Sequence, residues 1–175
     1  MSDDLENDAS TENLVRTVVS DPVHMLAFGF GTGLMPKAPG TFGSLPGLLL
    51  AWITLPLSLE WRLLVALVLV LAGIWICGES AKRLGIHDHP GIVWDEITGM
   101  YLTLLVVPPQ ITLWPHLITF WALGFGLFRL FDIWKPWPIR DLDHRLAGGV
   151  GIMLDDLVAA LYAAILLALG GWLIG

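Results

Sequence analysis

The chain has 175 residues, of which 55% are hydrophobic and 14% charged, and its mean hydropathy is +0.72. This balance is far more apolar than that of an ordinary soluble domain, so it indicates a protein embedded in a membrane. The formal net charge of −7 comes mostly from the first 21 residues. The remainder is nearly neutral and has no basic stripe, which excludes the usual signature of a nucleic-acid-binding protein.

Residues 1–21 form an acidic, polar segment with few apolar positions. Such a composition predicts a disordered leader in front of a single membrane-embedded domain, residues 22–175. The segment has no basic stretch followed directly by an apolar run and a cleavage site, so it does not resemble a secretory signal.

Five apolar runs follow along the chain, at residues 45–59, 61–77, 97–113, 117–131 and 157–174. Each is marginal for a bilayer core of about 30 Å, which a helix of about 20 residues crosses. Prolines at 46, 56, 108 and 109 interrupt the first and third runs, and the glycine-rich stretch 23–34 is expected in the interface. We therefore expect an all-α, polytopic membrane bundle of about four to five hydrophobic helices, some of them short or re-entrant.

The basic residues are distributed unevenly between the two sides that five spans would define. One side has Arg62 alone, and the other has eight residues: Arg16, Lys37, Lys82, Arg83, Arg129, Lys135, Arg140 and Arg145. The positive-inside rule places that basic side, with the N-terminus and the long loops, in the cytoplasm.

Carboxylates gather at the predicted ends of the apolar runs on this same side. Asp95 and Glu96 precede the third run, Asp155 and Asp156 precede the fifth, and Asp132 follows the fourth. Acidic residues can cap helix N-termini, but Asp132 lies at a C-terminus, where the helix dipole disfavours a negative charge. Five converging carboxylates would repel one another without a counter-charge, and oxygen ligands at a polar rim suit Mg²⁺.

Two cations follow Asp132 in the same loop. Lys135 and Arg140 are separated by a Pro-Trp-Pro segment that stiffens the backbone between them. Both residue types bind phosphate oxygens, the arginine through a planar fork. They would serve equally well as ordinary cytoplasmic anchors, although the rigid spacing favours phosphate binding.

Two further segments contribute candidate substrate-binding groups. In "GFGTGLMPKAPGTFGSLPG", glycine N–H groups could approach an anion, with Lys37, Thr41 and Ser44 as added donors. This segment matches neither the P-loop nor the dinucleotide fingerprint. In "HDHPG", His87 or His89 could donate a proton to a leaving alcohol, or could simply be a solvated loop histidine.

The segment "CGESAKR" has the cysteine-to-arginine spacing of cysteine phosphatases. A nucleophilic thiolate needs an electropositive pocket, whereas Glu79 occupies the position where phosphate would have to bind. We therefore reject a thiol mechanism based on Cys77.

Four blocks in order, "GTGLMPKAPGTFGS", "HDHPGIVWDEITGM", "FRLFDIWKPWPIRDLD" and "GGVGIMLDDLVA", resemble the signature blocks of the phosphatidylglycerophosphatase A family. The resemblance extends from about residue 24 to the C-terminus. It implies a Mg²⁺-dependent phosphatase of the bacterial inner membrane that converts phosphatidylglycerophosphate into phosphatidylglycerol and phosphate.

The resemblance also implies roles for particular residues. It points to Asp95, Glu96, Asp132, Asp155 and Asp156 as catalytic, all but Asp155 as metal ligands, and to Lys135 and Arg140 as substrate-binding. The nucleophile stays open between water and an aspartate. The alternatives are a phosphatase for another lipid phosphate, such as phosphatidate or a polyprenyl phosphate, or an ion-coupled transporter. Transporter sites usually lie near the membrane midplane, whereas these acids cluster at the ends of the runs.

Overall fold

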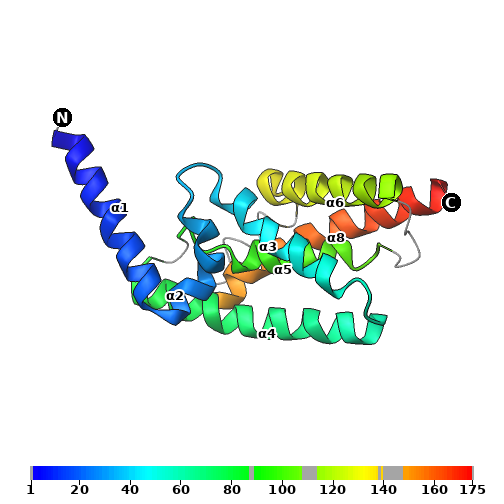
Figure 1. Cartoon of the computed structure of the whole chain (residues 1–175), viewed down its shortest axis with the longest axis horizontal. Helices are drawn as coiled ribbons and strands as arrows, with labels where there is room; N and C mark the ends of the chain where they lie inside the picture. Colours follow the sequence, from blue (N-terminus) through cyan, green and yellow to red (C-terminus); the bar gives the residue numbers. More distant parts are fainter. Residues whose placement is uncertain (1, 87–88, 108–113, 138, 140–147, 175) are drawn as a thin grey trace.

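The computed structural model describes residues 2–86, 89–107, 114–137, 139 and 148–174. Across these residues the regular elements are all helices (Figure 1), and they are α1 (Ser2–Ser20), α2 (Pro22–Ala27), the 3-10 helix η1 (Gly29–Leu34), α3 (Pro39–Thr54), α4 (Leu59–Leu84), α5 (Trp94–Leu104), α6 (Trp114–Trp134) and α8 (Gly149–Ile174). The prediction of an all-α bundle is confirmed.

Each of the five apolar runs contributes to one helix, but the helices differ in length. Within the described residues, three segments are long and apolar enough to cross a membrane: α4, residues 117–134 of α6, and residues 149–171 of α8. Helices α3 and α5 have 16 and 11 residues, about 24 Å and 17 Å at 1.5 Å per residue, which is short of the hydrocarbon core. The expectation of short members in the bundle is therefore confirmed.

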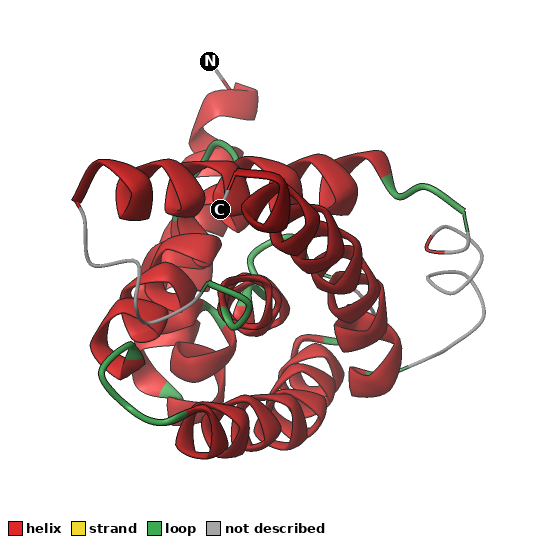
Figure 2. Cartoon of the chain, turned by 90° about the vertical axis from the view of Figure 1, so that its right-hand side faces the viewer, coloured by secondary structure: helices red, strands yellow, loops and turns green. Residues whose placement is uncertain are grey.

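Helix α5 lies at the centre of the bundle. Viewed along the long axis, the other helices surround a central one (Figure 2), and α5 contacts α3, α4, α6 and α8. Its side chains are buried around most of its circumference, including Ile97, Met100 and Tyr101. A helix that is apolar on all sides is stable only inside such a packed environment.

Small residues allow the helices to approach α5 and one another closely. A Cβ atom at Gly47 of α3 would overlap the backbone carbonyl oxygen of Ile97 in α5, and one at Gly149 of α8 would overlap that of Ile74 in α4. In membranes, van der Waals contact between closely spaced backbones replaces the hydrophobic effect as the source of helix association.

Arg62 is the lone basic residue on one of the two sides that the apolar runs predict. It is buried and lies at the C-terminal end of α5. It is 2% exposed, and its Nη2 donates a hydrogen bond to the carbonyl oxygen of Leu104 (3.1 Å). The hydroxyl of Tyr101 donates to the carbonyl oxygen of Arg62 (3.2 Å). A cation at this end satisfies a terminal carbonyl and matches the negative pole of α5.

Helix α1 (Ser2–Ser20) takes up most of the acidic segment. Val18 is fully buried and Leu14 packs against the core, so part of this helix is held by apolar contacts. The rest of α1 extends away from the bundle (Figure 1).

Asp21 joins α2 to the end of α4. Its Oδ1 accepts the N–H of Val23 (2.8 Å) and caps α2, while its Oδ2 pairs with Arg83 (2.7 Å). The hydrogen bond from Arg83, with that from Val23, lowers the pKa of the Asp21 carboxyl. The start of the domain is thus fixed to the end of the bundle where α4 terminates.

The polar loops meet at that same end. The C-termini of α4 and α6 and the N-termini of α5 and α8 all point towards it (Figure 1). The helix directions therefore bring carboxylates that are up to 61 residues apart in sequence, Asp95 to Asp156, to one end of the molecule.

Candidate active site

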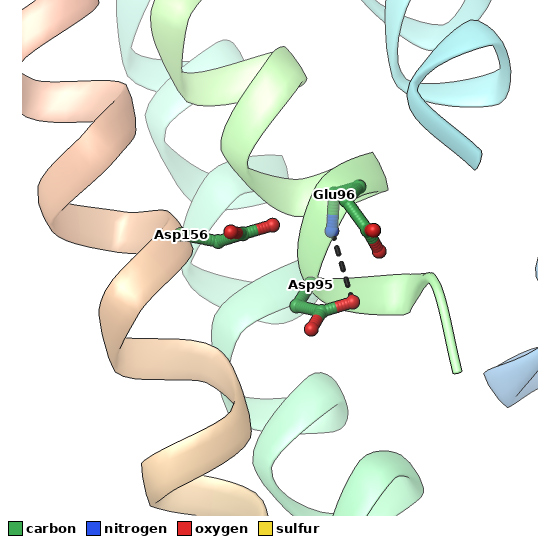
Figure 3. Close-up of side chains that lie close together, drawn as sticks. All are labelled: Asp95, Glu96 and Asp156. Atoms are coloured by element: carbon green, nitrogen blue, oxygen red, sulfur yellow. Dashed lines mark hydrogen bonds between the residues drawn. The ribbon is translucent and has the colours of Figure 1, made fainter. Parts of the chain in front are cut away.

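Three carboxylates from two helices converge at this end of the bundle. Asp95 and Glu96 lie in the first turn of α5, and Asp156 lies in the second turn of α8. Their side chains point towards one another (Figure 3), and one oxygen from each lies within 4.8 Å of the others. Asp95 and Asp156 are 9% and 2% exposed, so the group is largely removed from water.

Two oxygens of this group are buried without a hydrogen-bond partner among the described residues, Oε2 of Glu96 and Oδ2 of Asp156. Oδ1 of Asp95, by contrast, accepts the backbone N–H of Glu96 (3.1 Å). An ionised carboxylate without a partner is costly to bury. Two oxygens bound to one ion at about 2.1–2.5 Å lie at most about 4–5 Å apart, so the spacing fits a divalent cation that takes oxygen ligands.

The electrostatics of Asp95 and Glu96 agree with this fit. Both lie in α5, which is shorter than a membrane-spanning helix, and outside the three described segments that are long and apolar enough to cross a membrane. Burial, followed by the neighbouring Glu96, raises the pKa of Asp95, and burial raises the pKa of Glu96 to about 8. These groups therefore need either a proton or a cation at neutral pH.

Asp132 lies beside the three carboxylates and is held by an arginine. Its carboxylate interacts with those of Glu96 and Asp156. Its Oδ2 lies 2.5 Å from Nη1 of Arg129, three residues earlier on α6, and the same Nη1 lies 3.9 Å from Oε1 of Glu96. Arg129 therefore connects α6 to α5 and offsets part of the negative charge.

Asp155 also lies close to this group of carboxylates, and it forms an ion pair with a lysine. Nζ of Lys135 donates to its Oδ2 at 2.7 Å, joining the end of α6 to α8. Lys135 has a positive φ of 44°, and its N–H donates to the carbonyl oxygen of Phe131 (2.8 Å). This left-handed residue ends α6 and turns the lysine towards Asp155.

The glycine-rich segment reaches the site through Gly40, in the first turn of α3. A Cβ atom there would overlap Oε1 of Glu96 and lie 2.9 Å from Nη2 of Arg129. Ser44 is buried with its hydroxyl donated to the Gly40 carbonyl oxygen (2.8 Å), Thr41 is half-buried, and Lys37 is exposed. The predicted segment thus contacts the centre through its backbone at Gly40.

His89 takes part in the turn that precedes α5. Its Nδ1 accepts the N–H of Gly91 (3.0 Å), and its ring lies 5.3 Å from that of Phe28. This contact fixes the approach to the first turn of α5. The other two predicted groups, His87 and Arg140, lie outside the described residues.

Cys77 is buried in α4, with no exposed surface. Its Sγ contacts Sδ of Met153 at 4.0 Å, which is a packing contact between α4 and α8. The location supports the rejection of a thiol nucleophile, because a reactive cysteine must be reached by substrate.

Two residues of the site were not singled out from the sequence, Arg129 and Gly40. Arg129 precedes Asp132 by three residues, so the two share a helix face, and this spacing was the available signal. Gly40 had no such signal, because its role depends on how closely α3 packs against α5.

The fold and site define an all-α bundle with a buried acidic centre, and within the described residues three of its helices are long and apolar enough to cross a membrane. Comparison with known families gives the particular group. The family model described as "Phosphatidylglycerophosphatase A" matches residues 25–170. The chain belongs to the phosphatidylglycerophosphatase A family, and it is a phosphatase.

Two bacterial relatives bear that same description. The relative from Escherichia coli (strain K12) is 44% identical over 151 residues, covering 85% of this chain and 83% of its own. The relative from Haemophilus influenzae is 42% identical over 169 residues, covering 94% and 99%. A relative from Bacteroides thetaiotaomicron, described as "Putative phosphatidylinositol-3-phosphatase", is 38% identical over 157 residues, covering 86% and 94%. No solved structure matches the chain significantly.

Proposed function

We propose that this phosphatase hydrolyses the terminal phosphate of phosphatidylglycerophosphate and depends on Mg²⁺. Water supplies the oxygen that forms the new bond to phosphorus, and the bond from phosphorus to the glycerol oxygen breaks. The glycerol oxygen takes up a proton, so the products are phosphatidylglycerol and inorganic phosphate. The substrate is the one named for the two relatives in the same family.

The observation that supports the proposal is the convergence of Asp95, Glu96 and Asp156 with two unpartnered buried oxygens. These three residues would hold the Mg²⁺ ion. When bound, Mg²⁺ would neutralise the phosphate oxygens and stabilise charge that develops in the transition state.

The remaining charged residues would position the phosphate and the water. Arg129 lies within 4 Å of both Glu96 and Asp132, and its buried Nε has no hydrogen-bond partner among the described residues. We assign it to a phosphate oxygen, since a guanidinium offers several donors in one plane. Asp132, held by Arg129, would accept the proton of the attacking water.

The same proposal includes the location of the site. A lipid phosphate keeps its acyl chains in the bilayer and presents its headgroup at the rim, which suits carboxylates at the helix ends. The eight basic residues of that side argue for the cytoplasmic face of a bacterial inner membrane.

A different phosphorylated headgroup is the second candidate, and the relative described as a putative phosphatidylinositol-3-phosphatase favours testing it. The purified chain should be incubated with Mg²⁺ and, separately, phosphatidylglycerophosphate, phosphatidylinositol 3-phosphate, phosphatidate and a polyprenyl phosphate. We expect the highest kcat/KM for phosphatidylglycerophosphate. A higher value for another of these lipids would reassign the substrate, and no release from any of them would overturn the activity.

A further inference from the structure

An apolar groove runs between α3 and α6, on the part of the bundle not covered by another described helix. Its volume is about 620 Å³, within the range of roughly 300–1,000 Å³ typical of ligand sites. The lining residues are all hydrophobic: Leu45, Leu48, Leu49, Trp52, Leu117, Ile118, Trp121, Ala122 and Phe125. We call it the α3–α6 groove.

The groove begins next to the carboxylates. At Gly40, α3 lies against Glu96 and Arg129, so the start of α3 and the end of α6 meet at the site. Leu45 follows Gly40 by five residues, and Phe125 precedes Arg129 by four, which is about 6–8 Å along each helix. From there the lining extends away from the site, down α3 to Trp52 and up α6 to Leu117.

This direction matches the shape of one kind of ligand. A lipid phosphate has a charged headgroup joined to long apolar acyl chains. If the headgroup binds at the carboxylates, an acyl chain can extend along α3 and α6. The groove is about 11–12 Å long, measured along residues 45–52 of α3 and 117–125 of α6. Water is a poor occupant, because the lining offers few polar groups to bind it.

We infer that the α3–α6 groove binds an acyl chain of the lipid phosphate whose headgroup lies at the carboxylates. The inference rests on the proposed function, to which it adds a chain-binding subsite. The subsite would select substrates by chain length as well as by headgroup.

The test fills the groove and compares two chain lengths. Ala122→Trp adds bulk inside the groove, and Leu71→Trp, at an exposed position of α4 outside it, is the matched control. Ala122→Trp should raise KM for a dipalmitoyl substrate at least about tenfold. It should change kcat/KM for the dihexanoyl substrate less than twofold. The control should change neither. Equal effects on both chain lengths, or equal effects of both variants, would overturn the inference.

A second measurement tests acyl-chain binding in the α3–α6 groove without enzymatic turnover. It also decides the inference if the Ala122→Trp variant fails to fold. Wild-type protein and Leu49→Trp, which fills the groove from α3, are irradiated with a phosphatidylglycerophosphate that carries a diazirine in its acyl chain. Labelling of α3 and α6 peptides in the wild type, reduced in Leu49→Trp and not displaced by phosphatidylcholine, supports the subsite. Labelling that phosphatidylcholine displaces equally well identifies ordinary boundary lipid and overturns it. If wild type releases no phosphate, the proposed function fails while the labelling still decides the groove.

Discussion

Gly40 and Glu96 are in contact across the junction of α3 and α5, with no room for a side chain at residue 40. The contact joins the glycine-rich segment, whose glycines suggested an anion-binding loop, to one of the three converging carboxylates. The backbone of α3 therefore forms one wall of the acidic centre and holds the carboxylate of Glu96 in position.

Gly40→Ala should lower kcat strongly while the protein still folds. The added methyl group must displace Glu96 or Arg129, and small displacements of catalytic groups cost about 100-fold in rate. Gly126→Ala is the matched control, because a Cβ there meets nothing within 4 Å. That control should keep full activity and gain up to about 1 kcal/mol of stability from helix propensity. Normal kinetics in Gly40→Ala would show that the contact does not position the site.

Asp156→Asn and Glu96→Gln should each reduce kcat more than about 100-fold, because each removes one charged ligand for the cation. Asp132→Asn should reduce kcat by a similar factor if it accepts the proton of the water. The matched control is Glu79→Gln, a carboxylate paired with Arg83 outside the centre, and it should stay within twofold of wild type. Wild-type rates in Asp156→Asn would remove α8 from the site.

Arg129→Lys should raise KM and lower kcat by about 10-fold, and Arg129→Gln by more. Lysine retains a charge but lacks the planar fork that can contact Asp132 and phosphate together. Glutamine leaves Asp132 and Glu96 without their cation. Steady-state kinetics of both variants would separate phosphate binding from charge balance. Wild-type values for Arg129→Lys would argue that only the charge matters, and equal losses in the two variants would argue that only the guanidinium fork matters.

Mg²⁺ should stabilise the protein more at high pH than at low pH. Burial raises the pKa of Glu96 to about 8, so below that pH the cation-free carboxyl carries a proton that Mg²⁺ must displace. Apparent affinity should therefore fall as pH falls, by up to about tenfold per pH unit for each proton released. The increase in Tm caused by a fixed Mg²⁺ concentration, measured at about pH 6.5 and 8.5, should be larger at the higher pH. An increase independent of pH would contradict the shared role of the proton and cation.

Cys77→Ala should keep kcat and KM within twofold of wild type. The thiol packs against Met153 and has no exposed surface, so its loss leaves a small cavity that costs about 1 kcal/mol in unfolding free energy. Phosphate release by this variant and its Tm are the measurements. An inactive but folded variant would restore the thiol mechanism.

Hydropathy predicted the class of fold and the number of hydrophobic helices correctly, because apolar runs in a membrane protein are long and separated by polar loops. It could not predict that α5 lies at the centre, since α5 is short and its position depends on the small residues of α3. The burial of Val18, near the end of α1, could not be predicted for a related reason, because it depends on packing between separate elements.

The grouping of the carboxylates was easier to predict than their ion-pair partners. Carboxylates at the ends of apolar runs had to be paired or bound to a cation, and three of the five expected residues form one group. The partners of the others, Arg129 and Lys135, depend on contacts between separate helices. Lys135 was predicted to bind phosphate and pairs with Asp155 in this structure, a contact that no local pattern encodes.

Phosphate release from phosphatidylglycerophosphate, measured against Mg²⁺ concentration for wild type and Asp156→Asn, tests the central claim most directly. Wild type should be inactive after EDTA treatment, recover fully when Mg²⁺ is restored, and saturate with it. Asp156→Asn, although folded, should remain inactive at the Mg²⁺ concentrations that saturate wild type. Undiminished release in EDTA, or the same Mg²⁺ dependence in both proteins, would contradict a cation held jointly by α5 and α8.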